Sequence, residues 1–143
     1  MKKTLLSCAA ALGLAGAAHA DETPNLVTIL ASGEPQTQLM SMVLSMQSMQ
    51  QGAETRILLC GPAGDLALKD PPVSATAPQE PRGMSPQGLM QKIMAGGATV
   101  EVCAIYLPNK GVEADALLDG IVAAAPPDMA ARLLAPNTRI MSF

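Results

Sequence analysis

The sequence has few aromatic residues and few basic ones. Its 143 residues include no tryptophan, one tyrosine (Tyr106) and one phenylalanine (Phe143), too few for a surface that stacks on nucleic-acid bases or on sugars. Nine basic residues stand against twelve acidic ones, and the formal net charge is −3. This balance argues against nucleic acid or an anionic membrane surface as the partner. With so few aromatic rings, the core has to consist of aliphatic side chains and methionine.

Beyond its N terminus the chain also lacks a long apolar run. Lysines at positions 2 and 3 precede an apolar stretch that ends in the small-residue cleavage site Ala18-His19-Ala20. This pattern is typical of a secretory signal peptide over residues 1–20, because the apolar stretch is too short for a membrane helix and ends in a processing site. Residues 21–143 contain no second run close to twenty apolar residues, so we expect no membrane span.

Cleavage near Ala20 predicts a periplasmic protein and would remove His19, the only histidine. No histidine would then remain for acid–base catalysis or metal binding, and we expect no metal and no cofactor. Residues 21–143 suffice for a single domain with a core of its own.

Short apolar runs alternate with helical periodicity along residues 21–143. This alternation predicts an α/β fold with a roughly five-stranded, mostly parallel sheet and helices on both faces, in a flavodoxin-like layering. Right-handed crossovers place the first strand in the centre. The predicted strands are 25–30, 55–60, 99–105, a short addition at 121–122, and 138–143. The predicted helices are 35–51, 86–95, 113–120 and 126–134. The proline-rich segment 61–84 is predicted to be irregular, with room for one short helical turn around 65–69.

Several short motifs follow one another along the chain in a characteristic order. They are the turn ASGEPQT after the first strand, a glycine after the second, a glycine-ended helix before VEVC, the spacing from Cys103 to Lys110-Gly111-Val112, and the terminal TRIMSF. In this order the chain resembles the DsrE/DsrF-like sulfur-relay family, which includes the TusD-type sulfurtransferase subunits. The resemblance covers essentially all of residues 21–143. Two features differ: relay members of the family are usually cytoplasmic, and the aromatic-rich stretch that often follows their second strand is here LLCGPAGDLAL.

In the family, the cysteine at the position of Cys103 carries a persulfide between partner proteins, and a basic residue and a glycine match Lys110 and Gly111. The resemblance implies a protein that handles sulfane sulfur through Cys103, either as a sulfurtransferase or as a carrier without turnover, and the predicted signal peptide makes it an exported member. It also implies a homotrimer or homohexamer, with a sulfur donor or acceptor protein as partner. A buried, inert cysteine and a peroxide-reducing thiol are alternative interpretations of Cys103.

The turn after the first strand supplies two further binding candidates, Ser32 and Gly33. Backbone amides in such turns often bind anions, although a plain strand-to-helix turn explains the same residues.

Cys60 ends a different strand from Cys103. If the strands are ordered second, first, third, two spacings of about 4.8 Å each separate the two cysteines, more than the ~7 Å that a disulfide spans. We therefore expect no intramolecular disulfide and interpret Cys60 as a residue that fills a strand end, with a resolving thiol as the alternative.

Four methionines lie within residues 40–49 (MSMVLSMQSM). Thioethers suit Cu(I), so the alternative function is a periplasmic binding or assembly subunit without catalysis, one that handles Cu(I) through these methionines. However, Met42, Met46 and Met49 share a helical stripe with Leu39 and Val43, which predicts packing in the core.

Overall fold

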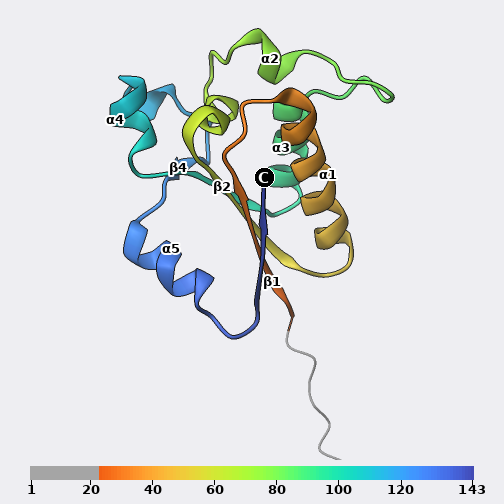
Figure 1. The fold of residues 1–143 in the computed structure, drawn as a ribbon, viewed down its shortest axis with the longest axis vertical. Coiled ribbons are helices and arrows are strands. Elements are labelled where there is room, and N and C mark those ends of the chain that lie inside the picture. The colour runs from red at the N-terminus through yellow and green to blue at the C-terminus, as the bar shows by residue number, and fades with distance from the viewer. Residues whose placement is uncertain (1–22) are drawn as a thin grey trace, which may run out of the picture.

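The computed structural model describes residues 23–143, and the predicted signal peptide with His19 lies outside the described residues. The described chain contains a five-stranded sheet in which every paired strand is parallel (Figure 1). Its strands are β1 (Asn25–Leu30), β2 (Glu54–Leu59), β3 (Thr99–Val102), β4 (Val122–Ala123) and β5 (Thr138–Ser142). The predicted α/β class and five strands are confirmed.

The strand order is β4-β3-β2-β1-β5, which differs from the prediction. β2 is the central strand, and β1 lies between β2 and β5. The crossover rule that placed the first strand in the centre fixes the hand of each connection but not the side on which the next strand is added. As a consequence β2 and β3 are direct neighbours, and the segments that follow them meet at one edge of the sheet.

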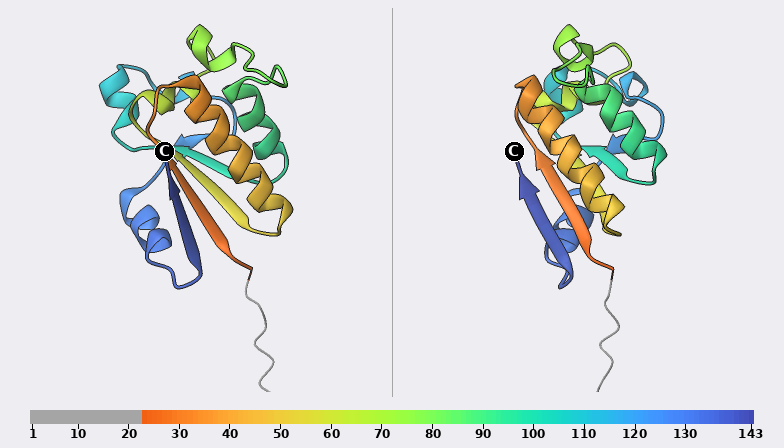
Figure 2. Two further views of the ribbon diagram at one scale, coloured as in Figure 1. Left: turned by 45° about the vertical axis from the view of Figure 1, so that its right-hand side comes forward. Right: turned by 90° about the vertical axis from the view of Figure 1, so that its right-hand side faces the viewer.

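Helices cover the two faces of the sheet unequally (Figure 2). α1 and α3 lie together on one face, and α5 lies on the other. The helices are α1 (Pro35–Gln50), α2 (Val73–Thr76), α3 (Pro86–Ala95), α4 (Tyr106–Lys110) and α5 (Pro126–Leu133), with 3-10 turns η1 (Gly61–Ala67) and η2 (Ala114–Ala116).

The predictions for the segment after β3 were partly wrong. The strand ends at Val102 and not at Ile105, and the predicted helix over 113–120 is only the turn η2. A helix forms earlier, as α4. It tolerates Pro108 because the first turn of a helix needs no hydrogen bond from that nitrogen.

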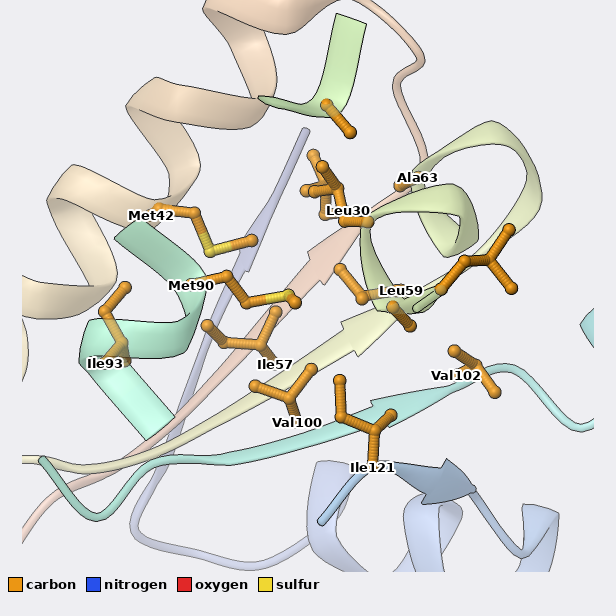
Figure 3. Packing of buried hydrophobic residues seen from close by; sticks show 14 of the residues in the cluster. Leu30, Met42, Ile57, Leu59, Ala63, Met90, Ile93, Val100, Val102 and Ile121 are labelled. Atoms are coloured by element: carbon orange, nitrogen blue, oxygen red, sulfur yellow. The ribbon is translucent and has the colours of Figure 1, made fainter. Parts of the chain in front are cut away.

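The main core fills the space between the sheet and the helices α1 and α3. Figure 3 shows aliphatic side chains of β1, β2 and β3 meeting methionines from these helices. Met42 is fully buried, and its predicted neighbours on the stripe pack against the same core, which confirms the stripe. Two serines of α1 are also fully buried. Ser45 Oγ lies 2.9 Å from Thr28 Oγ1 of β1, so α1 approaches the sheet through small, hydrogen-bonded side chains.

A smaller cluster lies under α5 on the opposite face. Its buried members are Val27, Leu58, Ala124 and Met129. The cover here is thin: Ile140 of β5 is 52% exposed and Leu134, which follows α5, is 84% exposed. In the part of the chain that the structure describes, no helix has the length and apolar character needed to cross a membrane.

Candidate functional site

The two cysteines of the described chain form a disulfide, Cys60–Cys103. The parallel register of β2 and β3 brings them together. Arg56 pairs with Thr99 and Leu59 with Val102, so the next position on each strand places the two cysteines opposite each other. Their Cα atoms are 5.0 Å apart, within the range of natural disulfides. The expectation of separated cysteines was wrong, because it placed β1 between these two strands.

Both cysteines continue the hydrogen bonding of the sheet beyond the strand ends. The Cys60 amide donates to the Leu30 carbonyl at 2.9 Å, and the Cys103 amide donates to the Leu59 carbonyl at 2.8 Å. Because side chains alternate between the faces of a strand, Cys60 shares the face of Leu58, and both cysteines pack against the cluster under α5. The backbone on both sides of the disulfide is therefore held by the sheet, and the sulfur atoms lie on its thinly covered face.

A small cavity adjoins the disulfide on this face. Its volume is about 240 Å³, several times the ~30 Å³ that a water molecule takes in the liquid. Cys103 lines this cavity. The other lining residues are all apolar: Leu58, Ala104, Ala124, Pro126, Met129, Ala130 and Leu133. A small sulfur compound could therefore reach Cys103 through an apolar opening, whereas Cys60 does not line this cavity.

A second, larger cavity of about 460 Å³ lies where η1 and α4 face each other. These segments follow Cys60 and Cys103 directly, so this cavity belongs to the same edge of the sheet. Its polar wall is an Asp65 carboxylate that accepts a hydrogen bond from the Tyr106 hydroxyl at 2.7 Å. The same oxygen, Oδ1, lies 2.7 Å from Lys110 Nζ. The lining residues are Gly61, Pro62, Asp65, Ile105, Tyr106, Asn109 and Lys110.

Tyr106 is held as a neutral hydrogen-bond donor. Burial raises the pKa of its phenol above the usual value, and the hydrogen bond to Asp65 and the charge of that carboxylate raise it further. Gly64 makes room for the ring, because a Cβ at position 64 would lie 2.3 Å from two ring carbons. The Tyr106 amide donates to the Cys103 carbonyl at 2.8 Å, which ties this wall to the disulfide.

The structure gives Lys110 and Gly111 local partners. Lys110 pairs with Asp65 across the larger cavity and keeps 38% of its side chain exposed. Gly111 ends α4 with a left-handed backbone (φ 74°), a conformation that glycine adopts without strain, and its amide donates to the Leu107 carbonyl at 2.9 Å.

Ser32 and Gly33 lie in the turn between β1 and α1, at the same edge of the sheet. Gly33 packs so closely on η1 that an added Cβ would lie 2.9 Å from Cβ of Pro62. The first amides of α1 bind a carboxylate from the chain itself: Glu34 accepts hydrogen bonds from the amides of Gln36 (3.1 Å) and Thr37 (2.8 Å). These hydrogen bonds, that of Thr37 above all, lower the pKa of Glu34. An internal carboxylate thus occupies the amides of Gln36 and Thr37, and a binding role of Ser32 and Gly33 stays a prediction.

The sequence interpretation missed Asp65, Tyr106 and the pairing of Cys60 with Cys103. One signal for Tyr106 was available, since the chain's only tyrosine comes three positions after the candidate thiol. Asp65, the partner of Tyr106 in η1, had no such signal, because its contact with Tyr106 depends on how β2 and β3 pair.

No protein-family model and no curated protein sequence matches this chain. Among solved structures it is similar to the ychN protein from E. coli, with a TM-score of 0.66 and 17% identity over 85% of this chain and 100% of that one. It is also similar to MTH1491 from Methanobacterium thermoautotrophicum, a protein of unknown function, with a TM-score of 0.61 and 11% identity over 84% of this chain and 99% of that one. The chain therefore has the DsrE-like α/β fold that the sequence resemblance implied.

Proposed function

We propose that this protein handles sulfane sulfur and that Cys103 is the thiol that accepts it as a persulfide. The observation that carries the proposal is the place of Cys103: it follows β3 at the carboxyl edge of the sheet, where α/β folds bind their ligands, and it lines an open apolar cavity. A thiolate in such a place can attack a sulfane donor, hold the sulfur and pass it to an acceptor thiol.

The sulfur-accepting species is the reduced protein. In the disulfide, Cys103 Sγ is bonded to Cys60 and is therefore no thiolate that could attack a sulfur donor. Opening the disulfide frees Cys103 while the sheet hydrogen bonds of both cysteines keep the backbone in place. The dithiol is therefore ready to react without refolding.

The neighbouring wall of Asp65, Tyr106 and Lys110 is proposed as the place where the donor or acceptor is bound. Lys110 offers a partly exposed cation, and Gly111 and the turn of Ser32 and Gly33 shape the same edge of the sheet. In this role Lys110 exchanges part of its interaction with Asp65 for one with an anionic sulfur compound.

We further propose that the protein is exported to the periplasm and associates with itself into a trimer or hexamer. A sulfur donor or acceptor protein is its proposed partner. The apolar side chains of Leu134 and Ile140, exposed on the thin face, support self-association, since exposed apolar surface favours protein contacts. Light scattering of the purified chain 21–143 measures the assembly, and the N-terminal sequence of the exported protein locates the cleavage.

The test of the proposal uses the variant Cys60→Ser, in which Cys103 is the only cysteine of residues 21–143. Treatment with a thiol persulfide should add about 32 Da to this variant, and a reductant should remove the added mass. The removal distinguishes a persulfide from a sulfinic acid, which forms irreversibly. Cys103→Ser is the matched control and should gain nothing. If the intact mass of Cys60→Ser stays unchanged, Cys103 does not accept sulfane sulfur.

A second candidate is a binding subunit in which the disulfide only stabilises the fold. The presence of the disulfide favours it, because exported domains commonly carry structural ones, and the 460 Å³ cavity would hold the ligand. The Cu(I) version of this candidate gains no support: Met42 is fully buried, and Met46 and Met49 pack against the same core, which leaves Met40, 53% exposed, as the one exposed thioether of the four. A disulfide that opens only when the protein unfolds would favour this candidate over sulfur transfer.

A further inference from the structure

We infer that Cys60 is a resolving thiol, so that the protein reduces bound sulfane sulfur and releases it as hydrosulfide. This inference rests on the proposed function and extends it from carrying sulfur to a second reaction. Its basis is the disulfide itself: Cys103, the candidate sulfur carrier, is bonded to Cys60, which follows the neighbouring strand β2.

The geometry favours attack by Cys60 on a persulfide at Cys103. The two Cα atoms are 5.0 Å apart, both side chains lie on one face, and each backbone is fixed by a sheet hydrogen bond. A pair held in the geometry of the product reacts as one molecule, and such intramolecular reactions have very high effective concentrations. A persulfide formed on Cys103 should therefore be short-lived in the dithiol protein.

The cavity distinguishes the roles of the two cysteines. Cys103 lines it and Cys60 does not, so a donor entering under α5 meets Cys103 first. The opening is also the exit for the released sulfur, because the outer sulfur of the persulfide extends from Cys103 into the cavity. We therefore assign the attacking thiol to Cys103 and the resolving thiol to Cys60.

The reaction balances in two displacements. First, the Cys103 thiolate attacks the outer sulfur of a thiol persulfide, R–S–SH; a new S–S bond forms, the donor S–S bond breaks, and the thiol R–SH leaves with that electron pair. Second, the Cys60 thiolate attacks Sγ of Cys103; the Cys60–Cys103 bond forms and hydrosulfide leaves with the electron pair of the broken bond. Two protein thiols are oxidised by two electrons, and one sulfane sulfur is reduced to sulfide. An external dithiol returns the protein to its starting state.

A single-turnover experiment tests the inference without any external reductant. The reduced chain 21–143, freed of reductant under anaerobic conditions, receives one equivalent of cysteine persulfide. Released sulfide and intact mass are then followed together. We expect about one sulfide per chain and a protein that is lighter by two hydrogen atoms because its disulfide has formed, with a persulfide visible only in early quenched samples.

The variant Cys60→Ser should hold the added sulfur, with a gain of about 32 Da and sulfide release at least about 100-fold slower than in the wild type. Cys60→Ala repeats the test with a side chain that has no hydroxyl. Wild-type protein that keeps the 32 Da adduct and releases no sulfide would overturn the inference and leave the proposed function standing. A variant that gains nothing, or gains a cysteinyl mixed disulfide of about 119 Da, would refute the proposed function and this inference together.

Discussion

The two faces of the sheet differ in what lies on them. The face under α1 and α3 carries the large core, in which many side chains are fully buried and the polar ones are hydrogen bonded. The face under α5 carries a cluster of four buried residues, the ion pair between Arg56 and Glu101, and the disulfide beside its cavity. One face holds the fold together, and the other leaves room for chemistry.

This difference follows from the cover that each face receives. Two helices lie on the first face, while the short helix α5 is the one that lies on the second (Figure 2). Both cysteines pack against the small cluster on this second face, where the cover is thinner and a side chain is easier to reach. The proposed chemistry depends on this arrangement: the packed face holds β2 and β3 in register while a bond between their ends opens and closes.

The largest expected effect compares two neighbouring leucines of β2. Leu59 is fully buried against the packed face, and Leu58 lines the cavity on the other. We expect Leu59→Ala to lower the free energy of unfolding by about 2–5 kcal/mol, and Leu58→Ala by less, since its surroundings already contain a cavity. Urea denaturation measures both. An equal or greater loss in Leu58→Ala would show that the two faces are packed alike.

Next in size is the effect of opening the disulfide. It closes a segment with a sequence separation of 43, for which chain entropy predicts a stabilisation of about 4 kcal/mol. We expect reduction to lower the thermal midpoint and to leave the circular dichroism spectrum at 25 °C unchanged, because the packed face does not depend on the bond. Cys103→Ser, which cannot form the bond, should melt as the reduced wild type does. Loss of structure on reduction would make the disulfide a structural requirement.

A smaller effect is expected from Tyr106→Phe, which removes the hydrogen bond to Asp65 at a cost of about 1 kcal/mol. Because the pKa of Tyr106 is raised in the fold, the folded state binds its proton more tightly than the unfolded state. The stabilisation is complete below the ordinary tyrosine pKa of about 10 and is lost as the pH rises further. The difference in stability between wild type and variant should therefore shrink above that pH. A constant difference across the range would contradict the assigned role.

The smallest effect concerns Glu34, the exposed cap of α1. Its lowered pKa means that the carboxylate stabilises the fold above the unfolded pKa and that this contribution disappears as the pH falls through the folded value. Glu34→Gln should melt at a slightly lower temperature than the wild type at pH 7 and at the same temperature at strongly acid pH. The alkylation rate of Cys103 should be unchanged, since the side-chain hydrogen bonds of Glu34 stay within its own turn, to Gln36 and Thr37.

Local patterns predicted most of the elements. The strand at 25–30, the helices that begin at Pro35, Pro86 and Pro126, and the start of a strand at Thr99 agree with the structure. These features depend on periodicity, caps and prolines, which are properties of neighbouring residues.

Pairings between distant residues were not predictable in this way. That Cys60 faces Cys103 depends on β2 lying beside β3 and on their register, and neither is written in the residues of either strand. The contact of Tyr106 with Asp65 depends in the same way on η1 meeting α4. It also needs a residue without a side chain at position 64, because a Cβ there would collide with the Tyr106 ring. The sequence alone does not show that the ring lies against this glycine.

The measurement that tests the account most directly is the rate at which each cysteine of the reduced, folded chain reacts with a small alkylating reagent. Peptide mass spectrometry assigns the label to Cys60 or Cys103, and the unfolding rate is measured on the same sample. The account predicts that Cys103 is labelled first and much faster than the protein unfolds, with Cys60 following. Labelling of both cysteines only at the unfolding rate would show an inert, structural pair and would contradict the proposed sulfur chemistry.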